Sequence, residues 1–242
     1  GIKKSYVQTI KALQQNIEEF PGLKIHLLDE VYPMGDEVVL IYEATGRVCR
    51  PGGLPIEQGV IVFNVETIYN VYQAMEAQKP VTEKYVSVVA EVENPVTVKV
   101  PLGCTLDEVV AQAGNITTKD PVYFVGGPMM GRTASTLQTP MIKGTSGILL
   151  DKRYAHRQPV ENCIRCGRCS DACPMGLEPF LLATLSRLHE WDGGENNKVV
   201  NCIECGSCSY ACPASRPVVD FVRLGKQTVM AAMRARAAAK KC

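Results

Sequence analysis

The chain has 242 residues, with 26 Lys and Arg against 25 Asp and Glu and a formal net charge of +1. This balance excludes a bulk electrostatic argument for nucleic-acid binding, so we expect no nucleic-acid partner. The apolar fraction of 46% is ordinary for a globular protein, and no stretch approaches the roughly 18 apolar residues of a membrane-spanning helix. We therefore expect one or two domains, or three small ones, and no transmembrane segment.

The first 80 residues predict an α/β pattern. Residues 5–19 place apolar side chains on one helical face, and residues 67–77 do the same around Val71 and Met75. Between them, residues 24–28 favour a strand, residues 38–42 favour a helix, and the β-branched run 60–65 is typical of a buried parallel strand. This is too little chain for a complete doubly wound sheet. The first residues also lack an initiator Met, so we expect an N-terminal truncation.

The next 70 or so residues predict a small domain rich in β-structure. Apolar side chains alternate on both sides of Asn94-Pro95, which predicts a hairpin. Thr105 and Glu108 have the spacing of a capping box, and that helix is expected to run to Gly114. We expect strands and a helix, in chain order, over residues 86–92, 96–100, 105–114, 122–125 and 147–150. This order is β-grasp-like.

Two less regular segments flank the last strands. GGPMMGR, which contains Gly127 and ends at Arg132, lacks the Lys-Ser/Thr of a phosphate loop. We interpret it as a tight turn between strands, with the Met pair in a core or an interface. Residues 151–158 are polar and are expected to link the β-rich domain to the rest of the chain.

The C-terminal third is organised around two cysteine motifs. CIRCGRCSDACP begins at Cys163 and CIECGSCSYACP begins at Cys202, each with the spacing Cys-x-x-Cys-x-x-Cys-x-x-x-Cys-Pro. This spacing is the bacterial ferredoxin signature for [4Fe–4S] clusters. Zinc sites usually take separated Cys-x-x-Cys pairs, and a disulfide framework needs an oxidising compartment. The motifs therefore predict a dicluster module in a reducing compartment.

The fourth cysteine of such a motif usually ligates the cluster of the other motif. We therefore expect one cluster on Cys163, Cys166, Cys169 and Cys212, and a second on Cys202, Cys205, Cys208 and Cys173. Gly167 and Gly206 fall between the second and third ligands, where the chain must bend. Cys49, Cys104 and Cys242 lie outside the motifs and are expected to be free thiols, while His26, His156 and His189 show no ligand spacing.

Helices are expected on both sides of the second motif. Leu181, Leu185 and Leu188 recur on one helical face, and Gly193-Gly194 is expected to end that helix. A second helix around residues 218–224 should pack on it, followed by a basic, Ala-rich helical tail. We interpret the tail as a solvated helix end. The weaker alternative is a contact with an acidic partner or an anionic membrane surface.

Taken together, these motifs resemble the C subunit of the Rnf electron transport complex. The paired cysteine motifs, GGPMMG, KGTSGILL and NVETIYNVY occur in the order of that family over nearly the whole chain. The resemblance implies a peripheral protein on the cytoplasmic side of the membrane, bound to other membrane subunits of the complex and to ferredoxin or a flavin-bearing partner. It also implies electron exchange between NADH and ferredoxin, coupled to the transport of Na⁺ or H⁺.

The family is similar in part to the flavin-bearing subunit of respiratory complex I, and this implies an α+β multidomain fold. The expected parts are a partial Rossmann-like domain for FMN and NADH, an SLBB β-grasp domain, a ferredoxin-type domain with two [4Fe–4S] motifs and the basic tail. Their expected ranges are 1–80, 81–152, 153–228 and 229–242.

The resemblance also implies flavin-side residues. Tyr32, Gly35, Asp36 and Glu37 match a Tyr-x-x-Gly-acid-Glu segment, and Asn64 and Thr67 match the flavin-binding Asn and Thr of the family, while Phe63 departs from its first Asn. The family's glycine-rich loop for the FMN phosphate is absent here. We therefore expect this chain alone to bind FMN or NADH poorly.

Two alternatives stay open. Complex I carries a single cluster motif at this place, so two motifs favour either the Rnf branch or the soluble NADH-dependent cobalamin reductases, which are built from the same modules. A docking scaffold with structural zinc is the alternative from another class of protein.

Overall fold

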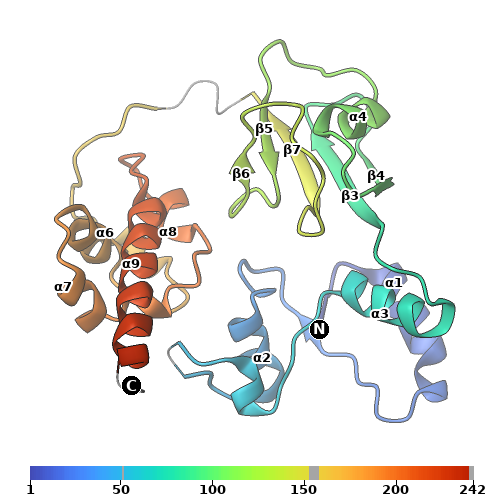
Figure 1. The fold of residues 1–242 in the computed structure, drawn as a ribbon, viewed down its shortest axis with the longest axis horizontal. Coiled ribbons are helices and arrows are strands. Elements are labelled where there is room, and N and C mark those ends of the chain that lie inside the picture. The colour runs from blue at the N-terminus through green and yellow to red at the C-terminus, as the bar shows by residue number, and fades with distance from the viewer. Residues whose placement is uncertain (51, 153–157, 240–242) are drawn as a thin grey trace.

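The computed structural model describes residues 1–50, 52–152 and 158–239. Figure 1 shows an N-terminal unit of short helices, a unit built on a mixed sheet, and a helical unit that carries both cysteine motifs. The fold is the expected α+β multidomain type. No helix in the described part of the chain has both the length and the apolar character needed to cross a bilayer.

The N-terminal unit is made of short elements joined by long irregular segments. Its elements are β1 (Ile2–Lys3), α1 (Val7–Asn16), a 3₁₀ helix (Ile17–Glu19), β2 (Leu27–Leu28), α2 (Glu37–Thr45), a 3₁₀ helix (Pro55–Gln58) and α3 (Val65–Ala77). β1 and β2 pair in parallel. Side chains cap both α2 and α3: Asp36 accepts a hydrogen bond from the Val38 N–H at 3.0 Å, and Asn64 accepts one from the Glu66 N–H at 2.9 Å.

The predicted buried strand over residues 60–65 is wrong. These residues form no strand, Phe63 is 55% exposed, and Val65 begins α3 with 83% of its surface exposed. A parallel strand needs a neighbour to pair its N–H and C=O groups. The N-terminal unit's described strands are only two residues long and pair with each other, so the apolar run has no sheet to join. The expected apolar side of α3 is exposed as well, with Met75 75% exposed.

The middle unit is a five-stranded mixed sheet with strand order β4-β3-β7-β5-β6. Its strands are β3 (Glu83–Ala90), β4 (Val96–Pro101), β5 (Val122–Val125), β6 (Arg132–Thr133) and β7 (Gly147–Asp151). β3 and β7 pair in parallel, and the other pairs are antiparallel. The helix α4 (Leu106–Val110) begins at the predicted capping box and places Leu106 in one buried core with Val86 and Ile148. The hairpin and its capped helix are thus confirmed.

The expected linker begins later than the sequence suggested. Asp151 belongs to β7 and is only 3% exposed, so the polar segment does not start there. Residues 153–157, including His156, lie outside the described residues, as do residues 240–242 with Cys242. The turn between β5 and β6 covers residues 126–131, and it confirms the interpretation of the glycine-rich segment as a turn between strands.

The helical unit packs two main helices around a small apolar core. Its elements are α5 (Arg168–Asp171), α6 (Pro179–Arg187), α7 (Trp191–Asn196), a 3₁₀ helix (Val199–Asn201), α8 (Ser207–Tyr210) and α9 (Val218–Ala239). Leu182 of α6 and Val222 of α9 are each 1% exposed. The two helices are close at Gly225, where an added Cβ would lie 2.1 Å from the Ser186 hydroxyl. The small side chains at this crossing allow the close approach.

Two sequence expectations for this unit need correction. The buried face of α6 is Pro179, Leu182, Ala183 and Ser186, one position from the predicted stripe, and Leu188 is 66% exposed. Gly193-Gly194 does not end a helix but lies within α7, where Gly194 is buried and a Cβ added to it would lie 3.8 Å from Val199 and from Val229.

The predicted basic tail is no separate element. α9 runs without a break to Ala239 and buries Val229. Near its end, Arg236 binds both carboxylate oxygens of Glu195 at 2.5 and 2.6 Å. The end of α9 is therefore tied to α7 of the same chain.

Candidate metal centre

The two cysteine motifs fold as a structural repeat. Each contributes a loop, a one-turn helix (α5 or α8) and a longer helix (α6 or α9). Equivalent residues of the two halves have the same left-handed backbone: Arg165 and Glu204 (φ 55° and 58°), Gly167 and Gly206 (81° and 84°), and Gly176 and Ser215 (61° and 50°). The matching angles show that both loops are bent in the same way.

Four of the cysteines line the larger cavity of the helical unit. Cys163, Cys166, Cys169 and Cys212 surround a space of about 790 Å³. Cys163 and Cys166 are exposed, and the other two are half-buried. We call these four residues the open quartet. It combines three cysteines of the first motif with the last cysteine of the second.

The other four cysteines line a smaller and more apolar cavity. Cys173, Cys202, Cys205 and Cys208 surround a cavity of about 20 Å³ together with apolar side chains such as Leu177. We call them the covered quartet, since Cys205 and Cys208 are each only 8% exposed. All ten described cysteines are free, so no disulfide competes for either set.

The covered quartet raises the pKa of its own thiols. Burial, followed by the nearby sulfurs of Cys202 and Cys205, raises the pKa of Cys208 to about 12, and burial also raises the pKa of Cys202. Cys173 adds to both shifts, so the thiol from the first motif is electrostatically close to those of the second. The Cys208 and Cys202 thiols are neutral at pH 7 without metal, and binding iron would displace their protons.

No group of three or more Cys, His, Asp or Glu side chains in the described ranges is arranged to hold a single metal ion. A four-iron cluster binds each cysteine through a different iron atom, so its ligands surround the cluster and do not converge on one point. The two sets of four free thiols supply the required number of ligands. The cavity of the open quartet, about 790 Å³, has room for a cluster, and the thiols of the covered quartet, around about 20 Å³, would have to move apart to take one.

Charged side chains of α9 hold the loop of the covered quartet, and no sequence motif predicted them. Glu204 lies between Arg223 and Lys226, at 3.3 and 3.1 Å. Lys226 also donates to the Cys202 carbonyl at 2.7 Å. The Glu204 N–H in turn lies 3.3 Å from the Cys202 sulfur, as a donor to a ligand thiolate would. The only sequence signal for this arrangement is a pair of basic residues about one helical turn apart and a distant Glu.

Two other units touch the same loop. The Tyr32 hydroxyl of the N-terminal unit donates a hydrogen bond to the Cys205 carbonyl at 2.7 Å. Burial, then the nearby Cys205 and Asp36, raise the pKa of Tyr32. From the sheet unit, the carbonyl of Met129 lies where a Cβ on Gly206 would be only 2.7 Å away. The turn 126–131 therefore rests on the loop of the covered quartet through its backbone, and a core or interface role for the Met129 and Met130 side chains stays a prediction.

This contact gives a matched test. Gly206→Ala should lower the free energy of unfolding by about 1–3 kcal/mol more than Gly167→Ala does, because only the added methyl at Gly206 meets a backbone atom, the Met129 carbonyl. Both positions have positive φ, so the backbone strain cancels in the comparison. Denaturant unfolding of the two variants measures the difference. Equal losses would mean that the turn does not rest on this loop.

The remaining flavin-side predictions lie at two helix starts. Asp36 and Glu37 begin α2, and Asn64 and Thr67 begin α3, with the Asp36 and Asn64 side chains used as caps. None of the six predicted residues lines the cavities described above. Glu66, which no motif singled out, joins α3 to β3 through Lys84 at 2.5 Å and the Tyr85 N–H at 3.0 Å.

The described thiols outside the motifs are not part of either quartet. Cys49 and Cys104 are half-buried, and burial raises the pKa of the Cys104 thiol. They are free, as expected from the sequence.

Comparison with known families divides the chain as its three units do. Residues 1–73 match the Nuo51 FMN-binding domain, residues 85–133 the SLBB domain, and residues 156–213 a 4Fe-4S dicluster domain. Each matched range falls on a different unit of the fold.

Curated relatives cover most of the chain. The C subunit of the Na⁺-translocating ferredoxin:NAD⁺ oxidoreductase complex of Acetobacterium woodii is 37% identical over 236 residues, 97% of this chain and 53% of that protein. The proton-translocating counterpart of Clostridium ljungdahlii is 36% identical over 237 residues, 96% and 51%. Cobalamin reductase PduS of Citrobacter freundii is 39% identical over 190 residues, 73% and 42%.

The chain thus spans about half the length of the curated relatives that it matches. The Rnf-type subunits match nearly all of it, and the PduS match is shorter. The flavin, SLBB and dicluster domains occur in that order within the one chain. Over nearly its whole length the chain is homologous to C subunits of ion-translocating ferredoxin:NAD⁺ oxidoreductase complexes, the Rnf complexes.

Proposed function

We propose that the chain passes electrons between a flavin and NADH side and a ferredoxin side of an Rnf-type complex that transports Na⁺ or H⁺. The observation that carries the proposal is the pair of cysteine quartets, each lining its own cavity in one helical unit. The relatives from A. woodii and C. ljungdahlii, whose names state such reactions, support it. Other subunits of such a complex are the proposed partners, and the proposed location is peripheral, on the cytoplasmic side of the membrane.

One [4Fe–4S] cluster would be held by the open quartet and a second by the covered quartet. When bound, each supplies a one-electron couple whose potential depends on burial and on hydrogen bonds to sulfur. The chain's own residues would exclude water, hydrogen-bond the sulfurs and leave one site accessible. In the covered quartet, Leu177 and Val219 help to exclude water, and the Glu204 N–H is placed to hydrogen-bond the Cys202 sulfur. The open quartet leaves Cys163 and Cys166 accessible to a partner.

For the flavin side we propose Tyr32, Gly35, Asp36, Glu37, Asn64 and Thr67, within the range that matches the FMN-binding domain. The hydrogen bond from Tyr32 to the Cys205 carbonyl supports a short route from this side to the covered quartet. Electrons would thus leave a flavin near Tyr32 and enter the chain's clusters at the covered quartet. NADH is the proposed hydride donor.

A second candidate function is a soluble cobalamin reductase, favoured by the 39% identity to PduS over 73% of the chain. The two functions differ in assembly. An Rnf-type protein should co-purify with membrane proteins of its complex, and a cobalamin reductase should not. Pull-down from solubilised membranes of the native host separates them.

The cluster assignment itself predicts metal content. Anaerobically purified or reconstituted chain should contain about eight iron and eight acid-labile sulfide per chain, and reduction should give two electron paramagnetic resonance (EPR) signals. A matched sample of the variant with all eight motif cysteines changed to Ser should contain neither. A folded wild-type chain that holds zinc and no iron would replace this proposal with the zinc scaffold.

A further inference from the structure

The two quartets differ sharply in what surrounds them. The covered quartet meets the N-terminal unit through Tyr32 and the sheet unit through Met129. The open quartet has exposed thiols at Cys163 and Cys166. The covered quartet therefore faces the rest of the chain, and the open quartet faces solvent.

The solvent side of the open quartet is cationic. Its cavity is lined by Arg165, Arg187 and Arg216, and no Asp or Glu is among the lining residues. Ile164 and Phe180, which also line it, are 70% and 37% exposed. An exposed apolar rim with positive charge and no negative charge has the composition of a binding surface for an acidic protein.

These three arginines, which we call the arginine rim, have no carboxylate partner in the described part of the chain. Arg216 donates to the Glu161 carbonyl at 3.1 Å, and Arg187 lies 5.6 Å from the centre of the Phe221 ring. By contrast, Arg223 and Lys226 of the same unit pair with Glu204. The charge of the rim is thus not neutralised by the described residues around it.

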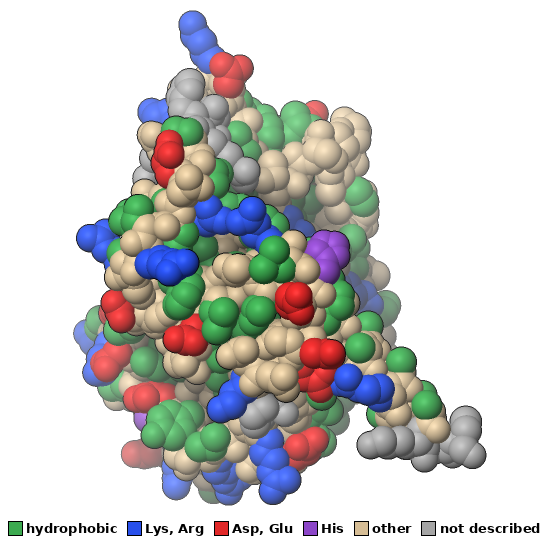
Figure 2. Space-filling view, turned by 90° about the vertical axis from the view of Figure 1, so that its left-hand side faces the viewer, with side chains coloured by type: hydrophobic (Ala, Val, Ile, Leu, Met, Phe, Trp, Pro, Cys, Tyr) green, Lys and Arg blue, Asp and Glu red, His purple; other side chains and the backbone are tan. Residues whose placement is uncertain are grey.

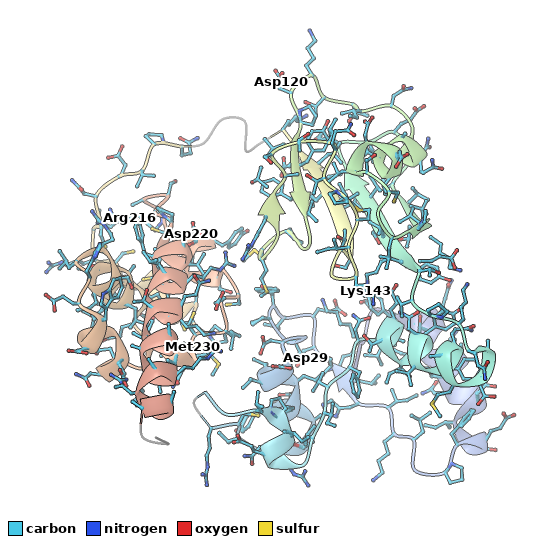
Figure 3. All side chains as sticks on the ribbon, viewed as in Figure 1. Asp29, Asp120, Lys143, Arg216, Asp220 and Met230 are labelled. Carbon is cyan, nitrogen blue, oxygen red and sulfur yellow. The ribbon has the colours of Figure 1, made fainter. Side chains whose placement is uncertain are left out.

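Figures 2 and 3 show the outer side of the helical unit. Figure 2 views the helical unit from its outer side and shows Lys and Arg side chains across the upper part of that face, with Asp and Glu and further Lys and Arg below them. Figure 3 labels Arg216 at the same upper end of the unit, on the side away from the sheet unit.

We propose that the arginine rim is the docking surface for an acidic one-electron carrier protein, which exchanges electrons with the cluster of the open quartet. This inference rests on the proposed function. In each exchange one electron moves from a reduced cluster of the chain to the oxidised centre of the carrier, or back. No covalent bond is formed or broken, and no proton is transferred.

The physical basis is electrostatic steering. Opposite charges speed the encounter of two proteins, and salt weakens the effect because exposed charges are screened beyond about 8–10 Å at physiological ionic strength. A carrier that docks here would also bring its redox centre close to the exposed residues Cys163 and Cys166. The covered quartet offers less access, since Cys205 and Cys208 are buried.

The test uses the reconstituted chain with its clusters photoreduced and a small, acidic two-cluster bacterial ferredoxin as the probe. Stopped-flow absorbance gives the second-order rate constant of electron transfer as a function of ionic strength. The variant is R165Q/R187Q, and the matched control is K119Q/K143Q, which removes the same charge from the sheet unit. Lys143 is labelled in Figure 3.

At low salt R165Q/R187Q should lower the rate constant about tenfold and flatten its dependence on ionic strength, while the control stays within about twofold of the wild type. Equal losses in both variants, or an unchanged salt dependence, would overturn the docking surface. Binding to anionic vesicles that R165Q/R187Q abolishes, without any effect on the ferredoxin rate, would make the rim a lipid contact. Iron and EPR signals are recorded on each sample, so a chain without clusters refutes the proposed function separately.

Discussion

Cys212→Ser is expected to remove the cluster of the open quartet and to leave the other cluster in place. Cys212 lies in the second motif but lines the cavity of Cys163, Cys166 and Cys169. Because three thiolates of one loop close only three corners of a cubane, loss of the fourth should cost that cluster and halve the iron content, from about eight to about four per chain. Iron and sulfide analysis with EPR measures the loss.

Comparing variants in pairs tests whether ligands cross between motifs. Cys212→Ser and Cys163→Ser should leave the same residual EPR signal, although their residues lie in different motifs. Cys173→Ser and Cys202→Ser should leave the other signal, since both residues line the covered quartet's cavity. Cys104→Ser, at a half-buried free thiol of the sheet unit, is the control and should change neither. If Cys212→Ser matched Cys202→Ser instead, each motif would bind its own cluster.

Gly225→Val should destabilise the helical unit by roughly 3 kcal/mol, the upper part of the usual range for overpacked cores. A Cβ at Gly225 would lie 2.1 Å from the Ser186 hydroxyl oxygen and 3.3 Å from the Ser186 Cβ. Ser186 is 2% exposed and donates to the Leu182 carbonyl at 2.8 Å, so its hydroxyl has no free space to enter. α6 and α9 would have to separate. Denaturant unfolding followed by circular dichroism measures the loss.

The matched control for this prediction is Ala232→Val. It places the same β-branched side chain on α9 at an exposed position, where only helix propensity changes and the expected cost is about 0.5 kcal/mol. Similar losses in the two variants would mean that α6 and α9 do not approach closely at Gly225.

Local patterns predicted local structure well. The hairpin of β3 and β4, the capping box at Thr105 and the helix α2 all follow from signals within a few residues, and the structure confirms them. The run over residues 60–65 failed because strand formation depends on a partner elsewhere in the chain. Likewise, Gly194 was interpreted as a helix end because the sequence does not reveal that Val229 packs against it.

The candidate sites show the same contrast between local patterns and contacts of distant residues. The eight cysteines can be identified from spacing alone, and their pairing across motifs stays a prediction for which the cavities supply supporting geometry. The hydrogen bond from Tyr32 to Cys205 joins residues 173 positions apart, and no local pattern encodes it. The same is true of the ion pairs of Arg223 and Lys226 with Glu204, which depend on how α9 lies across the loop.

The structural repeat has a further consequence at one pair of positions. Arg165 and Glu204 occupy the same place in their motifs and share the same backbone conformation, yet carry opposite charge. If both loops carried the same charge at this position, the two cluster sites would present similar surfaces to a redox partner. Here the negative member is tied inward to α9 and the positive one is left outward. The opposite charges at this one pair of positions thus make the two cluster sites unequal: the loop with Glu204 is bound within the chain, and the loop with Arg165 remains available to a partner.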